Sequence, residues 1–406
     1  MNRKYLNRAI IALIAYGLSP MAIATELPDE IDLQLSPETV LALEQDANRY
    51  AQAAGITPTQ ARGRFMAQMG SAELITKLRH TNRNRLAGIY SDYTNGNRIV
   101  VRLKGGGTHV RTKTVRVGDE VVTVEFRPGA PYTLAELDTA LEAGMPALME
   151  GLPTLQGGYA DERTGEVALQ VLASDLSKRN VATDLLGDFP VRLDVLTSPI
   201  TQQAMGGGTL GSPTCTSSFS VKQTSTGTLG ITTAAHCSNS LSSYSGADGA
   251  ATLTFKAESY NASDDYQWHT ASNTSQPKFV YQKSGTTFST RTLTGRRLQS
   301  STSVGNNLCH YGATTNYSCG DVTSTSYRPT WSCNGATCNA TFVSVGPPAS
   351  GTGLACAGGD SGGPWFVSTV AAGTHSGGSS AAPCQIAIYM STDRLSTLGL
   401  ELVFGP

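Results

Sequence analysis

The distribution of cysteine constrains the fold of this 406-residue chain more than any other feature. All eight cysteines lie between Cys215 and Cys384. Charge is distributed in the opposite sense, because residues 25–205 carry 23 acidic and 18 basic side chains, whereas residues 206–406 carry 8 and 9. A chain of this length can hold two or more domains. The sequence therefore predicts two regions of different construction and different tasks.

The first 24 residues have the pattern of an export signal. A basic start precedes an apolar run over residues 9–18, and Ala-Ile-Ala at 22–24 fits a small-residue cleavage site. The apolar run is too short to span a bilayer comfortably, which favours cleavage over a membrane anchor. An even number of cysteines in an exported chain indicates disulfides rather than metal ligands. We therefore expect residues 1–24 to be removed and the protein to be secreted, to the extracellular space or the periplasm.

Two short motifs in the second half indicate chemistry. Ser361 lies within Gly-Asp-Ser-Gly-Gly-Pro at 359–364, and His236 lies within Thr-Ala-Ala-His-Cys at 233–237. A serine hydroxyl is a poor nucleophile near neutral pH, and it becomes effective when an imidazole takes its proton and a carboxylate orients that imidazole. Glycines beside the serine let backbone N–H groups approach and stabilise an oxyanion. The pair predicts a serine nucleophile and its general base.

In this chain order the two motifs resemble the signature of the chymotrypsin-like serine endopeptidases. More narrowly, the chain resembles the secreted bacterial branch that includes alpha-lytic protease and the streptogrisins, well from about Cys215 onward and more loosely upstream. The resemblance implies an all-β domain of two packed β-barrels, with the base and carboxylate on the first barrel and the nucleophile on the second. Short apolar runs between clusters of Gly, Ser, Asn and Thr agree with this fold.

The Gly-x-Ser-x-Gly pattern around Ser361 also matches the nucleophile elbow of the α/β-hydrolases. In that fold the acid and then the histidine follow the serine along the chain. Here His375 precedes Asp393, and no parallel α/β repeat surrounds them. The chain order therefore favours the chymotrypsin-like fold.

The carboxylate that orients His236 is expected between His236 and Ser361. Asp265 is the preferred candidate, because it opens the segment Asp-Tyr-Gln-Trp-His, which resembles the family's aspartate followed by an apolar strand. Asp264 is the second candidate. The resemblance also implies that the backbone N–H groups of Gly359 and Ser361 form the oxyanion hole.

Asp360 has a structural role in the family that the chain resembles, where a buried cation holds its carboxylate and keeps the oxyanion loop formed. Bacterial relatives often supply an arginine directly after a cysteine, whereas this chain has His310 after Cys309. Two alternatives stay open. Either His310 pairs with Asp360, or another group does, such as a new N-terminus.

The resemblance and the spacing along the chain imply four disulfides, which are Cys215–Cys237, Cys309–Cys319, Cys333–Cys338 and Cys356–Cys384. Eight cysteines allow 105 connectivities, so the sequence alone does not select these pairs. Zinc binding is disfavoured because the chain has no Cys-x-x-Cys pair. We expect no metal ion and no organic cofactor.

The segment Thr-His-Ser-Gly-Gly at 374–378 resembles the strand that pairs with the substrate backbone. His375, Ser376, Gly377 and Gly378 are therefore predicted to bind the substrate. No carboxylate lies where a trypsin-like pocket would need one, which disfavours cleavage after Lys or Arg. A neutral pocket favours an apolar or aromatic residue before the cleaved bond (the P1 residue), whereas a histidine at this position, as in glutamyl endopeptidases, favours glutamate. Both preferences stay open.

Residues 25–205 are predicted to form an α/β region without a catalytic motif. We expect helices over 25–80, with a stop at Gly55 and a second helical run over 59–78, and a further helix over 134–149. Strands are expected over 99–103 and 167–172, and residues 115–126 are expected to form one strand or two. The resemblance implies a pro-region that assists folding and blocks the active site. A barrel built from non-local contacts folds slowly, so a template for it is physically reasonable. An independent binding domain is the alternative, and a cleavable boundary is expected over 199–206.

Together these features predict a secreted, self-processing serine endopeptidase, with a signal peptide at 1–24, a pro-region at 25–205 and a protease domain at 206–406. Its expected partners are peptide or protein substrates and its own pro-region, and the mature form is expected to be a monomer. The net charge of −1 gives no indication of nucleic acid or an anionic membrane as a partner. The alternatives are a catalytically silent binding protein on the same fold and a protease that cuts only itself.

Overall fold

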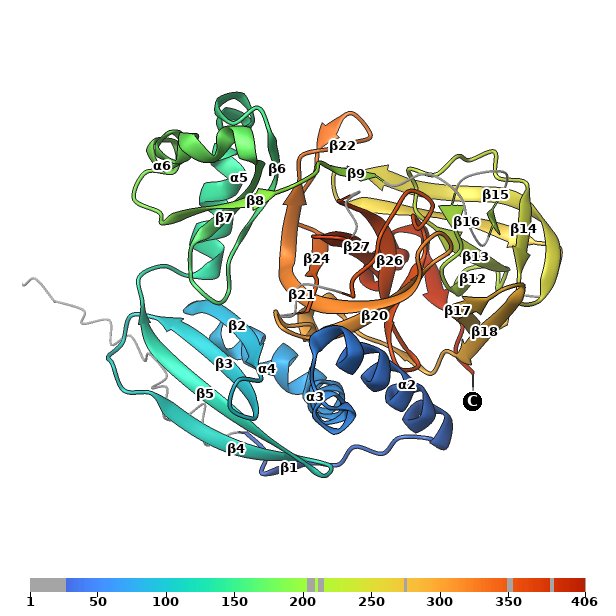
Figure 1. Cartoon of the computed structure of the whole chain (residues 1–406), viewed down its shortest axis with the longest axis horizontal. Coiled ribbons are helices and arrows are strands. Elements are labelled where there is room, and N and C mark those ends of the chain that lie inside the picture. Colours follow the sequence, from blue (N-terminus) through green and yellow to red (C-terminus); the bar gives the residue numbers. More distant parts are fainter. Residues whose placement is uncertain are drawn as a thin grey trace, which may run out of the picture.

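The computed structural model describes residues 27–202, 209–210, 215–273, 276–348, 353–379 and 383–405. The predicted signal peptide, residues 1–24, lies outside the described residues, as do residues 203–206 of the predicted boundary. The upstream helices and strands, blue to green in Figure 1, lie along one side of a β-rich downstream domain. Within the described ranges, no helix is long and apolar enough to cross a membrane.

Three helices open the upstream region, α2 (Pro37–Ala54), α3 (Pro58–Gly70) and α4 (Ala72–Asn82). α2 begins after the N-cap Ser36, whose hydroxyl accepts the Thr39 N–H, and ends at Gly55, which has φ 65°, as the sequence predicts. The helical run predicted over 59–78 is present, but it is divided into α3 and α4 at Ser71. The chain leaves helical geometry at Ser71, with φ −90° and ψ 3°, directly after a glycine, which is a weak helix former.

A five-stranded sheet packs against these helices, with strand order β1-β4-β5-β3-β2. Its strands are β1 (Glu30–Ile31), β2 (Leu86–Asp92), β3 (Asn97–Lys104), β4 (Arg111–Val117) and β5 (Glu120–Ala130). They include the strands predicted over 99–103 and 115–126. The core between sheet and helices contains apolar side chains such as Ile75, Val101 and Val124.

A second upstream unit follows, made of α5 (Leu134–Gly151), β6 (Leu155–Ala160), β7 (Val167–Leu172), the 3-10 turn η1 (Ala173–Lys178), α6 (Arg179–Leu186) and β8 (Val191–Leu196). Leu141, Leu169 and Ala182 are part of its buried core. β6 pairs with strand β21 (Asn316–Pro329) of the downstream domain, with Gly158 opposite Arg328. The sheet of this unit therefore continues into the downstream domain.

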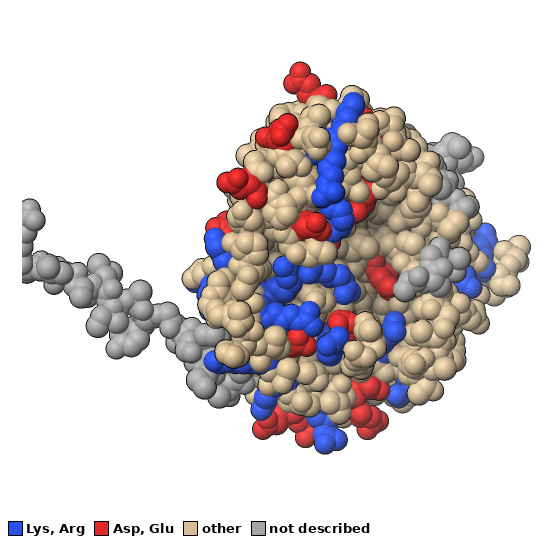
Figure 2. All heavy atoms as spheres, turned by 60° about the vertical axis from the view of Figure 1, so that its left-hand side comes forward, with Lys and Arg blue, Asp and Glu red and all other residues tan. Residues whose placement is uncertain are grey.

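Charged side chains of opposite sign lie beside one another on the upstream region, as Figure 2 shows. Arg192 on β8 lies 2.8 Å from a carboxylate oxygen of Asp161 and 2.9 Å from one of Glu166. Arg79 on α4 reaches the buried Glu162 at 3.0 Å. These ion pairs connect α4, the turn between β6 and β7, and β8.

The downstream domain consists of β-strands with short 3-10 turns. The first sheet contains β10 (Thr209–Leu210), β11 (Cys215–Thr216), β12 (Ser220–Gln223), β13 (Leu229–Thr233), β14 (Ser243–Gly246), β15 (Gly249–Asn261), β16 (Asp264–Ala271) and β28 (Leu400–Leu402). The second contains β20 (Asn307–Gly312), β21 (Asn316–Pro329), β24 (Phe342–Gly346), β25 (Pro364–Val367), β26 (Val370–Ser379) and β27 (Ala387–Ser391), joined by β9 (Ile200–Gln202), β19 (Gly295–Arg296) and the upstream strands β6 to β8.

Smaller elements complete the domain, namely the hairpins β17 (Lys278–Ser284) with β18 (Thr287–Thr292) and β22 (Ser332–Cys333) with β23 (Ala336–Thr337), and the 3-10 turns η2 (Gln299–Ser301) and η3 (Thr392–Leu398). One continuous core of large side chains, including Trp268, Tyr327 and Trp365, extends from the two sheets to helices α2 and α3. The predicted fold class, a double β-barrel domain preceded by an α/β region, is confirmed.

Candidate active site

Three residues predicted from the motifs meet where the first barrel faces the second. His236 Nε2 lies 2.7 Å from Ser361 Oγ, and His236 Nδ1 lies 2.9 Å from Asp265 Oδ2. Because Nδ1 faces a carboxylate, it carries the ring proton, and Nε2 can accept the proton of the serine. Asp265 also accepts the backbone N–H of His236 at 3.0 Å. One carboxylate therefore holds both the ring and the main chain of His236.

The positions of these three residues follow from the barrel strands. His236 lies in the turn after β13, and Asp265 lies near the start of β16, which is paired antiparallel with β13. The pairing sets Thr233 opposite Gln267, so the start of β16 lies beside the turn. Ser361 comes from the loop before β25 of the second barrel.

Asp264, the second candidate for the carboxylate, is bound elsewhere. Its Oδ2 accepts hydrogen bonds from Ser259 at 2.8 Å and from Asn261 at 3.2 Å, and its Oδ1 faces Arg394 at 3.8 Å. Adjacent residues of a strand point to opposite faces, so only one of two neighbouring aspartates can face the turn. The structure brings Asp265 to the imidazole.

The charge of Asp265 is maintained by its surroundings. Burial would raise the pKa of this carboxyl group, but the adjacent His236 and the hydroxyl of Ser376 hold its pKa below the ordinary value. The side chain of Asp265 is fully buried. Its fixed negative charge can therefore stabilise a positively charged imidazolium next to it.

Asp360 is held by backbone N–H groups and a hydroxyl. Its carboxylate accepts the N–H of Thr314 at 3.0 Å, the N–H of Thr315 at 3.1 Å and the N–H of Ala357 at 2.9 Å. The hydroxyl of Thr315 donates at 2.6 Å. Sequence reasoning missed these donors, because a backbone N–H carries no side-chain signal.

His310, one of the two partners considered for Asp360, contacts other groups. Its Nε2 lies 2.6 Å from the carbonyl oxygen of Ala355 and 2.8 Å from the hydroxyl oxygen of Ser318, and its ring stacks on Trp365 with 4.5 Å between centroids. Burial lowers the pKa of His310, although the nearby charge of Asp360 acts in the opposite direction. The ring therefore belongs to an aromatic stack behind the site.

The main chain around the serine is fixed from the first barrel. The Thr216 hydroxyl donates to the carbonyl of Gly359, and the Thr216 N–H donates to the carbonyl of Ser361, both at 2.7 Å. Gly359 has φ 105°, a conformation that residues with a side chain rarely adopt. The loop that carries the two predicted oxyanion donors is therefore held on both sides of Asp360.

His375 is buried on β26 within the same stack. The indole N–H of Trp365 donates to His375 Nδ1 at 3.2 Å, so the proton of the neutral ring lies on Nε2. Burial lowers the pKa of His375 well below its ordinary value, and the nearby His310 and His236 lower it further. The ring is therefore neutral at neutral pH.

The upstream chain occupies the strand that was predicted to bind substrate. β9 pairs antiparallel with β26, with Thr201 opposite Gly378 and Gln202 opposite Gly377. A Cβ atom at Gly377 would lie 2.4 Å from the Thr201 carbonyl oxygen, so a glycine is required for this approach. A strand of three residues has no readable periodicity, which is why the sequence did not predict it.

The eight cysteines form the four disulfides that the family resemblance implies, Cys215–Cys237, Cys309–Cys319, Cys333–Cys338 and Cys356–Cys384. The first closes the loop that ends beside His236, and the last joins the segment before the Ser361 loop to the connection between β26 and β27. In the part of the chain that the structure describes, no group of three His, Cys, Asp or Glu side chains could hold a metal ion.

Comparisons with known proteins place the downstream domain in a family. Residues 207–397 match the family model described as Trypsin, and no curated protein matches the chain. Thermobifida fusca protease A is 28% identical, with a TM-score of 0.37 and coverage of 50% of this chain and 100% of that one. Nocardiopsis protease is 24% identical, with a TM-score of 0.37 and coverage of 49% and 98%. A glutamic acid specific serine protease, described as using a histidine triad in substrate binding, is 25% identical, with a TM-score of 0.39 and coverage of 50% and 98%. Over residues 207–397, this chain is therefore a chymotrypsin-like serine endopeptidase of the trypsin family.

Proposed function

We propose that the chain is the precursor of a secreted endopeptidase that processes itself, with a signal peptide at 1–24, a pro-region at 25–205 and a protease domain at 206–406. The observation that carries the catalytic part is the hydrogen-bonded series of Ser361, His236 and Asp265. Peptides and proteins are the substrates of this enzyme class.

The residues of the site have different roles in the proposed reaction. His236 Nε2 takes the proton of Ser361 while Oγ attacks the peptide carbonyl. Asp265 keeps the proton of the imidazole on Nδ1 and stabilises the imidazolium. The N–H groups of Gly359 and Ser361 stabilise the oxyanion. His236 then protonates the leaving amine, and water, activated by the same imidazole, hydrolyses the acyl-enzyme.

The pairing of β9 with β26 supports a pro-region that blocks the active site. A peptide that adds a strand to β26 uses the same main-chain groups that β9 uses in this structure. β9 ends at Gln202, so we expect the cleaved bond within residues 203–206, which lie outside the described residues. The pairing of β6 with β21 would hold the pro-region in place after cleavage.

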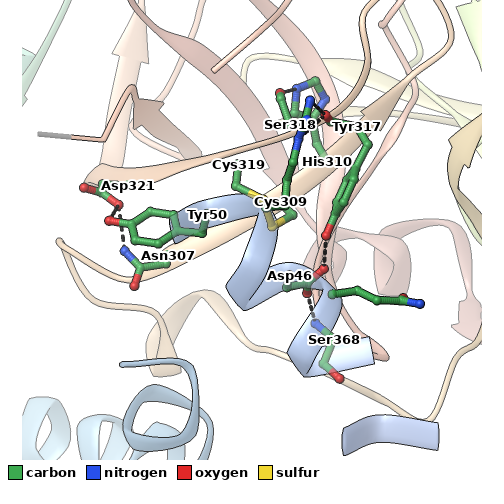
Figure 3. Close-up of a disulfide and its surroundings, with 12 residues drawn as sticks. Asp46, Tyr50, Asn307, Cys309, His310, Tyr317, Ser318, Cys319, Asp321 and Ser368 are labelled. Atoms are coloured by element: carbon green, nitrogen blue, oxygen red, sulfur yellow. Dashed lines mark hydrogen bonds between the residues drawn. A yellow bond between two sulfur atoms is a disulfide. The ribbon is translucent and has the colours of Figure 1, made fainter. Parts of the chain in front are cut away.

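Helix α2 adds side-chain contacts to this inhibited state. Figure 3 shows the helix beside the Cys309–Cys319 disulfide, with Asp46 and Tyr50 directed at the second barrel. Asp46 accepts a hydrogen bond from Arg291 Nη1 at 2.7 Å, and the Tyr50 hydroxyl donates to Asp321 at 2.8 Å. Because these contacts do not involve the cleaved bond, self-cleavage is expected to leave a non-covalent complex.

The pocket favours an apolar or aromatic P1 residue over glutamate. Of the four residues predicted to bind the substrate, Gly377 and Gly378 have no side chain, and the hydroxyl of Ser376 acts on Asp265. His375 is neutral and stacked, so a glutamate would meet no cation there. Peptides that differ only in Phe, Leu or Glu before the cleaved bond test this preference through kcat/KM. A higher value for Glu would reverse it.

The decisive experiment is expression of the wild-type precursor beside Ser361→Ala, with Ser240→Ala, an exposed serine, as the control. Wild type and the control are expected to yield a fragment of about half the chain length, with an N-terminus just beyond Gln202, while Ser361→Ala remains whole. If Ser361→Ala is processed as well, another protease makes the cut. Fractionation of the culture shows whether the product is exported.

Two further measurements separate the alternatives. A silent binding protein would not react with an organophosphate, whereas the proposed enzyme is labelled at Ser361. A protease that cuts only itself would be labelled but would not turn over peptides supplied in trans. Turnover of such peptides by wild type, and its absence in Ser361→Ala, is the expected result.

A further inference from the structure

Three side chains of β16 face the turn that carries His236. Asp265, Gln267 and His269 alternate along the strand, so they lie on one side of the sheet. All three are fully buried. The residues between them, Tyr266 and Trp268, belong instead to the main hydrophobic core.

Gln267 holds the main chain on both sides of His236. Its side-chain Nε2 donates to the carbonyl oxygens of Ala234 and Cys237, each at 2.8 Å. Between these two carbonyls, the N–H of His236 donates to Asp265 at 3.0 Å. Both amide hydrogens of Gln267 are thus used on the short segment that presents the imidazole, and β16 side chains hold that segment at three points.

His269 fixes the direction of this amide. Its Nε2 lies 3.0 Å from Gln267 Oε1, so the ring N–H donates to the amide oxygen. Burial lowers the pKa of His269 to about 4, and the neutral ring keeps that donor at working pH. A reversed amide would place Oε1 against two carbonyl oxygens and its NH₂ group against a donor. The ring of Phe255 packs on His269 with 5.6 Å between centroids.

We propose that Gln267, oriented by His269, is a positioning residue that sets where His236 stands relative to Ser361. The inference rests on the proposed role of His236 as the general base. The imidazole has only two side-chain torsions, so its 2.7 Å contact with Ser361 depends on where the turn lies. Gln267 acts on that turn without touching the reacting atoms.

The test replaces Gln267 by methionine, which has a similar shape and no amide. In the processed enzyme, kcat per titrated active site is expected to fall by about 10- to 100-fold with KM nearly unchanged, because the base is displaced and the binding strand is not. The acid limb of the pH profile of kcat is expected to shift, since the contact of His236 with Asp265 changes as well. Thr270→Val, on the same strand with a half-buried side chain, is the matched control and should leave kcat unchanged.

Two variants at His269 test whether His269 orients Gln267. They also test the proposal if Gln267→Met does not fold. His269→Gln retains a donor near the position of Nε2 and is expected to preserve kcat. His269→Phe retains the ring contact with Phe255 but removes the donor, and kcat is expected to fall.

The proposal is overturned if Gln267→Met lowers thermal stability but leaves kcat within about twofold of wild type and the pH profile unshifted. It is also overturned if the two His269 variants have the same kcat. Failure of the proposed function gives a different result, because wild type itself would then neither label with an organophosphate nor hydrolyse peptides.

Discussion

At the scale of single residues, Asp265 contacts His236 at two places, the ring Nδ1 and the main-chain N–H. The first contact selects the tautomer that lets Nε2 accept a proton, and the second holds the residue against β16. Asp360 is the residue before Ser361, and four donors hold its carboxylate in place. Two buried carboxylates therefore order His236 and the loop of Ser361 separately.

Replacement of Asp265 by asparagine tests the first of these roles. An amide in this place favours the tautomer with the proton on Nε2, which cannot accept the proton of Ser361. We expect kcat to fall by about 10⁴-fold with little change in the fold. Asp264→Asn is the control, and its kcat should stay close to wild type. Equal losses in the two variants would mean that Asp265 does not orient the imidazole.

At the scale of elements, α2 presents one face to the second barrel. Asp46 and Tyr50 are four residues apart, so they lie one above the other on that face, and both are buried. Asp46 meets Arg291, while the N–H of Ser368 donates to the same carboxylate at 2.5 Å. Ser368 has φ 56°, so this carboxylate binds a tight turn of the barrel. The helix thus supplies polar partners to groups that belong to the protease domain.

Loss of Asp46 is expected to destabilise the precursor strongly. Asp46→Ala would leave Arg291, which is 4% exposed, without its ion-pair partner. The expected loss in the free energy of unfolding is about 3–5 kcal/mol. Urea unfolding of precursors that also carry Ser361→Ala measures it. Glu38→Gln, an exposed acceptor on the same helix, should change stability by less than about 0.5 kcal/mol, and equal effects of the two changes would contradict the role of Asp46.

The stability of the contact between α2 and the second barrel is also expected to depend on pH, through Asp321. Burial raises the pKa of Asp321 to about 6, against hydrogen bonds from Tyr50 and Asn307 that lower it. A carboxyl group whose pKa is higher in the folded than in the unfolded chain stabilises the fold while it is protonated. This contribution is complete below about pH 4 and is lost as the pH rises through about 6.

The change with pH can be measured in the precursor that carries Ser361→Ala. Between about pH 4 and pH 7, we expect Asp321 to account for a loss of up to about 3 kcal/mol in the free energy of unfolding. With Asp321→Asn, this part of the loss should disappear. If the two precursors lose stability in parallel, Asp321 does not titrate in this range.

At the scale of the whole molecule, the upstream region contacts the downstream domain at several places. Among them, α2 contacts the buried Arg291, β6 pairs with the edge of β21, and β9 pairs with β26. Each contact joins segments far apart in the sequence. A fold that depends on such pairings forms slowly, because chain closure precedes the contacts that stabilise it. We therefore propose that the upstream region provides a surface on which the second barrel assembles.

Removal of the upstream region tests this role. Residues 206–406 refolded alone are expected to give at least about 10-fold fewer titratable active sites than the full precursor. Residues 25–205 added as a separate chain should restore them. An equal yield without the upstream region would show that the barrel domain folds unaided.

Local patterns in the sequence were enough to predict the serine and histidine, the confinement of disulfides to the second half and the stop of α2 at Gly55. Each of these depends on neighbouring residues or on composition, whereas the double β-barrel fold was implied by the family resemblance that the two motifs carry. The tertiary structure decided between Asp264 and Asp265, supplied backbone donors for Asp360, paired β9 with β26 and brought Gln267 to the turn of His236. These features depend on strand register and on main-chain groups, which every residue carries alike. Only folding, which joins distant segments, determines which of these groups meet.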